Sequence, residues 1–125
     1  MKLLDDSGAP VIRIHFSPAA SDEELEQAVA GTAAVFARGK KVVFIIDISE
    51  LKVSFTVQRR ARLTELMQTI QKDADRLMKG AIYIAPTVVG RGVVTALNWA
   101  RGKRPYPIRV VASAAEADVI AKGLL

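Results

Sequence analysis

The amino-acid sequence predicts an α/β domain with a four- to five-stranded, mainly parallel mixed sheet and about four helices. Three observations support this class. Strand-like and helix-like stretches alternate along the chain, one continuous apolar run has the composition of a buried central strand, and helix-start patterns follow the strands. Alternation of this kind favours a parallel sheet with right-handed crossovers. The length of 125 residues suits a single domain covering residues 1–125.

The first predicted strand is Val11-Ile12-Arg13-Ile14-His15-Phe16, where polar residues alternate with apolar ones. We expect one face of this strand to be buried. The segment from Lys2 to Asp5 is compatible with a short additional strand ahead of it.

The first predicted helix starts at Ser21-Asp22-Glu23-Glu24, which has the spacing of a capping box. Apolar residues then recur at helical spacing as far as Phe36, and Gly39 supplies the stop.

The central strand is predicted at Val42–Ile48, a run of apolar residues interrupted only by Asp47. Such a run is typical of a strand covered on both faces. From Val57 to Met78 the apolar residues fit one face of a single long helix.

The last third of the chain predicts a strand at 81–85, a helix opened by Pro86-Thr87 and ended by Gly102, and a strand at 107–111. Ser113 and Glu116 then form a second capping-box pattern ahead of the final helix.

The composition excludes several chemistries. The absence of cysteine rules out disulfides, thiol catalysis and cysteine-ligated metals. The first six residues lack the apolar region of a signal peptide, and no apolar run is long enough to span a membrane, so we expect a cytoplasmic protein. The net charge of +5 favours anionic partners, although the basic residues are spread along the chain.

At Asp47-Ile48-Ser49, followed by the loop through Ser54 and Thr56 to a helix, the sequence resembles the STAS family, the anti-sigma factor antagonist domains. The order of elements over about residues 10–122 is similar as well. The resemblance implies a STAS-like sandwich that regulates a partner protein, with Ser54 or Thr56 as candidate phosphorylation sites. The sequence departs from the Asp-Ser-Ser/Thr-Gly pattern of phosphorylated members, since it has no acid before Ser54 and no glycine after it.

The candidate site lies at the carboxyl ends of the parallel strands, where ligands and partners of open α/β sheets usually bind. The side chains placed there are Asp47, Ser49, Ser54, Thr56, Arg59, Arg60, Thr87 and Arg91. Hydroxyl groups at helix starts hold an anion or serve as ordinary N-caps, and the second role is the commoner one. Asp47 is expected to accept hydrogen bonds from its own loop, because an acid ending an apolar strand needs partners.

No catalytic arrangement is evident, because no nucleophile, base and orienting acid share a recognisable spacing. His15 is the single histidine and is expected on the sheet surface. We therefore predict no enzyme activity, no metal and no cofactor.

The sequence thus favours a non-catalytic regulatory module that binds another protein through residues 47–60 and 87–92, with a homodimer as a reasonable accompaniment. One alternative is a sensor or carrier holding a nucleotide or lipid beneath the helix from Val57 to Met78. A second is peripheral contact with nucleic acid or an anionic membrane, which predicts salt-sensitive binding.

Overall fold

The computed structural model describes residues 4–5, 7–15, 21–50, 57–88, 90–92, 94–95 and 102–125. Its strands are β1 (Leu4–Asp5), β2 (Val11–His15), β3 (Val42–Asp47), β4 (Met78–Ile84) and β5 (Ile108–Val111), and its helices include α1 (Asp22–Phe36), α2 (Val57–Gln68), α3 (Gln71–Leu77) and α5 (Ala114–Leu124). Residues 88, 90–92 and 94–95 are also helical.

The five strands form one sheet in the order β1-β2-β3-β4-β5. The first pair is antiparallel and the other three pairs are parallel. The predicted α/β class with a mainly parallel mixed sheet is confirmed, and β1 is the short strand expected before Val11.

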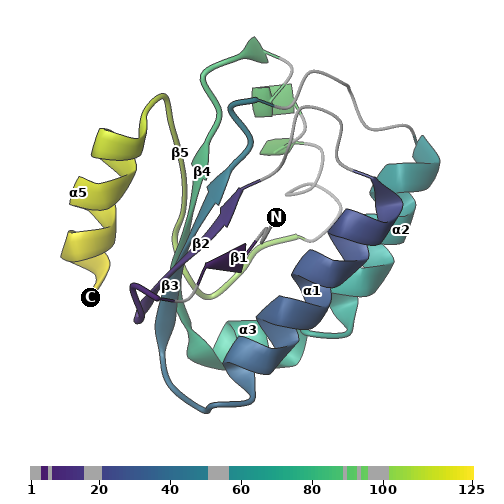
Figure 1. The fold of residues 1–125 in the computed structure, drawn as a ribbon, viewed down its shortest axis with the longest axis horizontal. Coiled ribbons are helices and arrows are strands. Elements are labelled where there is room, and N and C mark those ends of the chain that lie inside the picture. The colour runs from purple at the N-terminus through teal and green to yellow at the C-terminus, as the bar shows by residue number, and fades with distance from the viewer. Residues whose placement is uncertain are drawn as a thin grey trace.

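The helices are divided unevenly between the two faces of the sheet. Among the helices whose bounds are given above, α1, α2 and α3 lie on one face of the sheet and α5 lies on the other (Figure 1). Strands added one after another in the same direction by right-handed crossovers place the connecting helices on a single face. Helix α5 follows the last strand and is free of that constraint, so it covers the opposite face.

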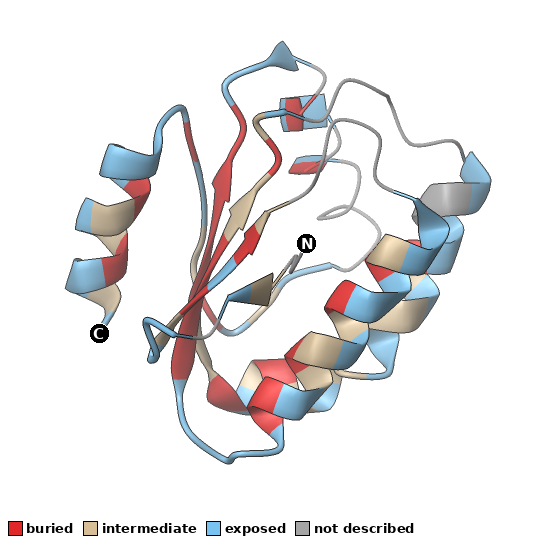
Figure 2. Ribbon diagram, viewed as in Figure 1, coloured by how far each residue is buried: buried red, intermediate tan, exposed pale blue. Residues whose placement is uncertain are grey.

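Each face has its own apolar core. The larger core packs Phe36 of α1 edge-on against Phe44 of β3, with ring centroids 5.7 Å apart. The smaller core joins Ile45 and Ile82 of the sheet to Ala117 of α5. Buried residues accordingly follow the strands and the inward faces of the helices (Figure 2). The burial of β3 on both faces agrees with the apolar run that predicted it.

Helix α1 begins and ends where the sequence predicts. The hydroxyl of Ser21 accepts a hydrogen bond from the Glu24 amide at 3.1 Å, and the Glu24 carboxylate returns to the Ser21 amide, which completes the capping box. At the other end, Gly39 adopts a φ of 73° and its amide donates to the Phe36 carbonyl. Glycine adopts this left-handed backbone without the steric penalty that other residues incur.

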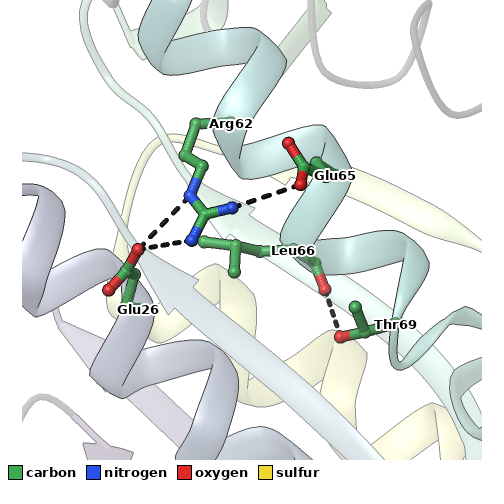
Figure 3. Close-up of polar contacts among 5 residues, drawn as sticks. All are labelled: Glu26, Arg62, Glu65, Leu66 and Thr69. Carbon is green, nitrogen blue, oxygen red and sulfur yellow. Dashed lines mark hydrogen bonds and ion pairs between the residues drawn. The ribbon is translucent and has the colours of Figure 1, made fainter.

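The prediction of one long helix from Val57 to Met78 is wrong. Helix α2 ends at Gln68, α3 starts at Gln71, and Met78 already belongs to β4. The Thr69 hydroxyl donates to the Leu66 carbonyl at 2.6 Å (Figure 3), and the Thr69 amide also turns back to that oxygen. Since the apolar spacing continues across the break, the pattern alone does not reveal it.

An ion pair joins α1 to α2. The guanidinium of Arg62 donates to Glu26 of α1 at 2.8 Å and to Glu65 of its own helix at 3.3 Å (Figure 3). The hydrogen bond to Glu26 raises the pKa of Arg62 above its usual value.

Among the described residues, no helix is long and apolar enough to cross a membrane.

Candidate functional site

Three turns meet at the carboxyl end of the parallel strands. The Ile48 amide, after β3, donates to the Ile84 carbonyl at 3.1 Å, and the Ala85 amide, after β4, donates to the Val111 carbonyl of β5 at 2.9 Å. These bonds extend the sheet by one residue at each step. They also hold the turns that follow β3, β4 and β5 side by side.

Asp47 ends β3 and organises the first of these turns. Its Oδ1 accepts a hydrogen bond from the Ser49 amide at 2.9 Å, as expected from the sequence. Burial raises the pKa of Asp47, but hydrogen bonds from the Ser49 hydroxyl and amide and from His15 outweigh this effect, so the pKa lies below its usual value. The carboxylate is therefore held in its charged form.

His15 lies between two carboxylates. Its Nδ1 is 3.3 Å from Oδ2 of Asp47, and its Nε2 is 3.2 Å from Oε2 of Glu50. His15 and Asp47 are partners in the parallel register of β2 and β3. The sequence placed His15 correctly on the sheet surface, but it gave no reason to group His15 and Glu50 with Asp47, because the register of two separate strands is not visible in it.

The connectivity of this cluster differs from that of a catalytic triad. In a triad the histidine accepts the serine proton and the acid holds the far side of the histidine ring. Here the Ser49 hydroxyl is bonded to Asp47, and the second ring nitrogen of His15 is paired with Glu50. The cluster thus contains a serine, a histidine and an acid, but their hydrogen bonds stabilise the turn after β3 and do not connect the serine hydroxyl to the histidine.

Thr87 and Arg91 organise the turn after β4. The Thr87 hydroxyl accepts a hydrogen bond from the Gly90 amide at 3.1 Å, which is the geometry of an N-cap. Nε of Arg91 donates to the Ala85 carbonyl at 3.1 Å. Both residues are exposed, so each stabilises the turn and still reaches solvent.

The two glycines beside Arg91 have different surroundings. A Cβ atom at Gly90 would lie 3.2 Å from the Thr87 hydroxyl oxygen and 3.4 Å from Cβ of Ala85, whereas a Cβ at Gly92 would meet nothing within 4 Å. Close packing therefore accounts for Gly90. It does not account for Gly92, which is exposed.

Beside this turn lies an open hollow, which we call the Arg91 hollow. It has a volume of about 650 Å³ and is bordered by the turn after β4, the end of β5 and one side of α5. The lining residues are Arg91, Val110, Val111, Ala112, Ala115, Glu116, Val119 and Ile120. Val119 is 72% exposed and Val110 is 45% exposed, which leaves apolar surface in solvent.

Glu116 fixes one wall of the Arg91 hollow. Its carboxylate accepts a hydrogen bond from the Ala112 amide at 2.9 Å, while its own amide donates to the Ser113 hydroxyl. The predicted capping pattern is thus present at the serine, but the glutamate bonds one residue earlier than a capping box would have it. Sequence reasoning missed Val110 and Val119 because it followed the helix starts rather than the exposed sides of β5 and α5.

The predicted site residues are only partly brought together. Asp47 contacts Ser49 and His15, whereas Arg91 contacts the Ala85 carbonyl and borders the hollow. Ser54 and Thr56, including the predicted modification sites, lie outside the described residues. Arg59 and Arg60 lie in the first turn of α2, and their side chains are likewise outside the description.

Within the described part of the chain, no group of three or more histidine, aspartate or glutamate side chains is arranged to hold a metal ion. Comparison with known proteins found no family model, no curated protein and no solved structure that matches the chain.

Proposed function

We propose that the chain is a non-catalytic regulatory module that binds a partner protein at the carboxyl end of its sheet, with the Arg91 hollow as the central contact. The observation that carries this proposal is the combination of a fixed guanidinium and exposed valine side chains around one open concavity. Exposed apolar surface beside a polar rim is typical of protein interaction sites.

The charges of the hollow indicate what kind of surface would fit. The Glu116 carboxylate is engaged by the Ala112 amide, and the Arg91 guanidinium uses one of its five N–H donors on the Ala85 carbonyl. Arginine is well suited to bidentate pairing with a carboxylate. A partner segment that carries an acidic residue next to an aliphatic one would pair with Arg91 and cover Val119.

The resemblance to STAS domains supports a regulatory role, since that family acts by binding other proteins. The proposed setting is the cytoplasm, because a cysteine-free chain suits a reducing compartment. The partner segment can also belong to a second copy of this chain, and the proposal then includes a homodimer.

The proposal is tested by affinity capture from source lysate with four baits, namely the wild type, Arg91→Glu, Val119→Asp and Lys103→Glu. Lys103 is exposed and precedes β5, at the opposite end of the strands from the hollow, so it controls for a change in net charge. We expect a protein that the wild type and the Lys103 variant retain and the two hollow variants lose. Retention by all four baits, or equal loss from all three variants, contradicts the proposal.

A further inference from the structure

A second cavity lies on the other face of the sheet, beneath α1, α2 and α3. It has a volume of about 110 Å³. Its walls include Ala28 of α1, Phe44 of β3, Leu63 and Met67 of α2, and Ile70 between α2 and α3. We call it the core cavity. It is separate from the Arg91 hollow, which lies beside α5.

The described residues that line the core cavity include no charged side chain. Three lining residues carry a hydroxyl group, namely Thr32, Tyr83 and Tyr106, and the Thr32 hydroxyl donates to the Ala28 carbonyl at 2.8 Å. The surface that the wall presents to the cavity is nevertheless almost entirely apolar. An ordered water needs two to four polar partners, and apolar cavities without them stay dry. The chemistry of the wall therefore favours an apolar occupant over water or an ion.

The volume limits the size of that occupant. An engineered apolar cavity of about 150 Å³ in another protein binds benzene or xenon, whereas drug-sized ligands use pockets of roughly 300–1,000 Å³. The core cavity thus has room for one small ring or a short hydrocarbon. A nucleotide or a whole lipid would exceed it.

The cavity wall includes the break between α2 and α3. Ile70 sits in the break, with Met67 one turn before it and Met78 at the start of β4, and all three line the cavity. Methionine is unbranched and has several rotatable bonds, so it adapts to an irregular apolar partner. The break between α2 and α3 therefore contributes Ile70 to the cavity wall, beside two methionine side chains that can adapt to an occupant.

We propose that the core cavity is a binding site for a small, uncharged, apolar molecule, either a single aromatic ring or a short hydrocarbon. The site does not depend on the proposed protein partner, because cavity and hollow share no lining residue among those described. Binding in the core cavity and capture at the Arg91 hollow can accordingly succeed or fail separately.

The test is a methyl-resolved NMR titration of the full chain with xenon, benzene and benzoate. We expect saturable shifts with xenon and benzene at the methyl groups of Ala28, Ala74, Met67 and Met78, which line the cavity, and none at Val119 on α5. Benzoate should cause no such shifts, since its charge would be buried without a partner. The absence of saturable shifts with both apolar probes, or equal shifts at Val119, overturns the proposal.

Two variants locate the site. Ala28→Leu adds three carbons to the cavity wall and should abolish benzene binding, while Ala34→Leu on the exposed side of α1 should leave it unchanged. Met67→Ala enlarges the cavity and should bind benzene at least several-fold more tightly. Should Ala28→Leu fail to fold, the Met67 variant decides. Benzene affinity that neither cavity variant changes would place the binding elsewhere and overturn the assignment.

Discussion

The imidazole of His15 lies against the carboxylate of Asp47, with 3.3 Å between Nδ1 and Oδ2. These residues end two neighbouring parallel strands and face each other in the register. The contact couples the last residue of β2 to the turn that Asp47 organises through Ser49. A change in the charge of Asp47 should therefore alter the stability of the carboxyl end of the sheet.

The first prediction concerns acid. The pKa of Asp47 lies below its ordinary value of 3.8 in the folded protein, so the folded state binds the proton less readily than the unfolded chain. Its stabilising contribution is fully present above that ordinary value and is lost as the pH falls through the lower folded-state pKa. We expect Asp47→Asn to lower the free energy of unfolding at pH 7 by about 1 kcal/mol and to weaken its decline between pH 5 and 2.

Urea unfolding at a series of pH values measures this effect. Glu23→Gln, an exposed carboxylate in the first turn of α1, is the matched control for removing one negative charge. If Asp47→Asn and Glu23→Gln lose stability in parallel with the wild type as the pH falls, then the hydrogen bonds to Asp47 do not hold its charge.

The second prediction uses Gly90 and Gly92, which lie in the helical residues that follow the turn after β4. Gly92→Ala should raise stability by about 0.5–1 kcal/mol, because alanine favours the helix and its Cβ enters open space. Gly90→Ala should melt at a lower temperature than Gly92→Ala, because its Cβ would press on the Thr87 hydroxyl that caps the helix. Thermal unfolding of the two variants compares them directly. Equal melting temperatures would show that the packing around Gly90 adjusts without cost.

The sequence predicted the parts of the fold that local patterns encode. The capping box at Ser21 and Glu24, the glycine stop at Gly39 and the apolar run of β3 each involve residues close together in the chain. Their physical causes are hydrogen bonding within one helical turn, the backbone freedom of glycine, and burial of a strand on both faces.

The parts that were missed depend on distant partners or on a single side-chain bond. The pairing of His15 with Asp47 requires the register of β2 on β3, and the Arg91 hollow requires the placement of α5 beside β5. At the break after α2, the Thr69 hydroxyl and the amides of Thr69 and Ile70 donate hydrogen bonds to carbonyls three residues earlier in the chain. These bonds leave the spacing of the apolar residues unchanged. Hydrophobic periodicity reports which face is buried and is insensitive to all three features.

The third prediction concerns the ion pair between α1 and α2. The side chains of Arg62 and Glu26 are about half exposed and that of Glu65 is 69% exposed, so solvent screens their attraction. We expect Arg62→Gln and Glu26→Gln to lower stability only slightly, and the coupling in a double-mutant cycle to disappear in 1 M salt. A coupling that persists in high salt would mean that the pair acts through packing of the arginine stem rather than through charge.

The fourth prediction compares the two serine caps. Ser21→Ala should lower the free energy of unfolding by about 1 kcal/mol, since it removes both the acceptor for the Glu24 amide and the hydroxyl that donates to the Glu24 carboxylate. Ser113→Ala should cost less, because the hydrogen bond that it removes, from the Glu116 amide, is longer at 3.3 Å than the bond from the Glu24 amide to Ser21 at 3.1 Å. Chemical denaturation of both variants, with Ser21→Asp as a capping-competent control, tests the order. A larger loss at Ser113 than at Ser21 would contradict this order and would mean that the length of the cap hydrogen bond does not set its contribution.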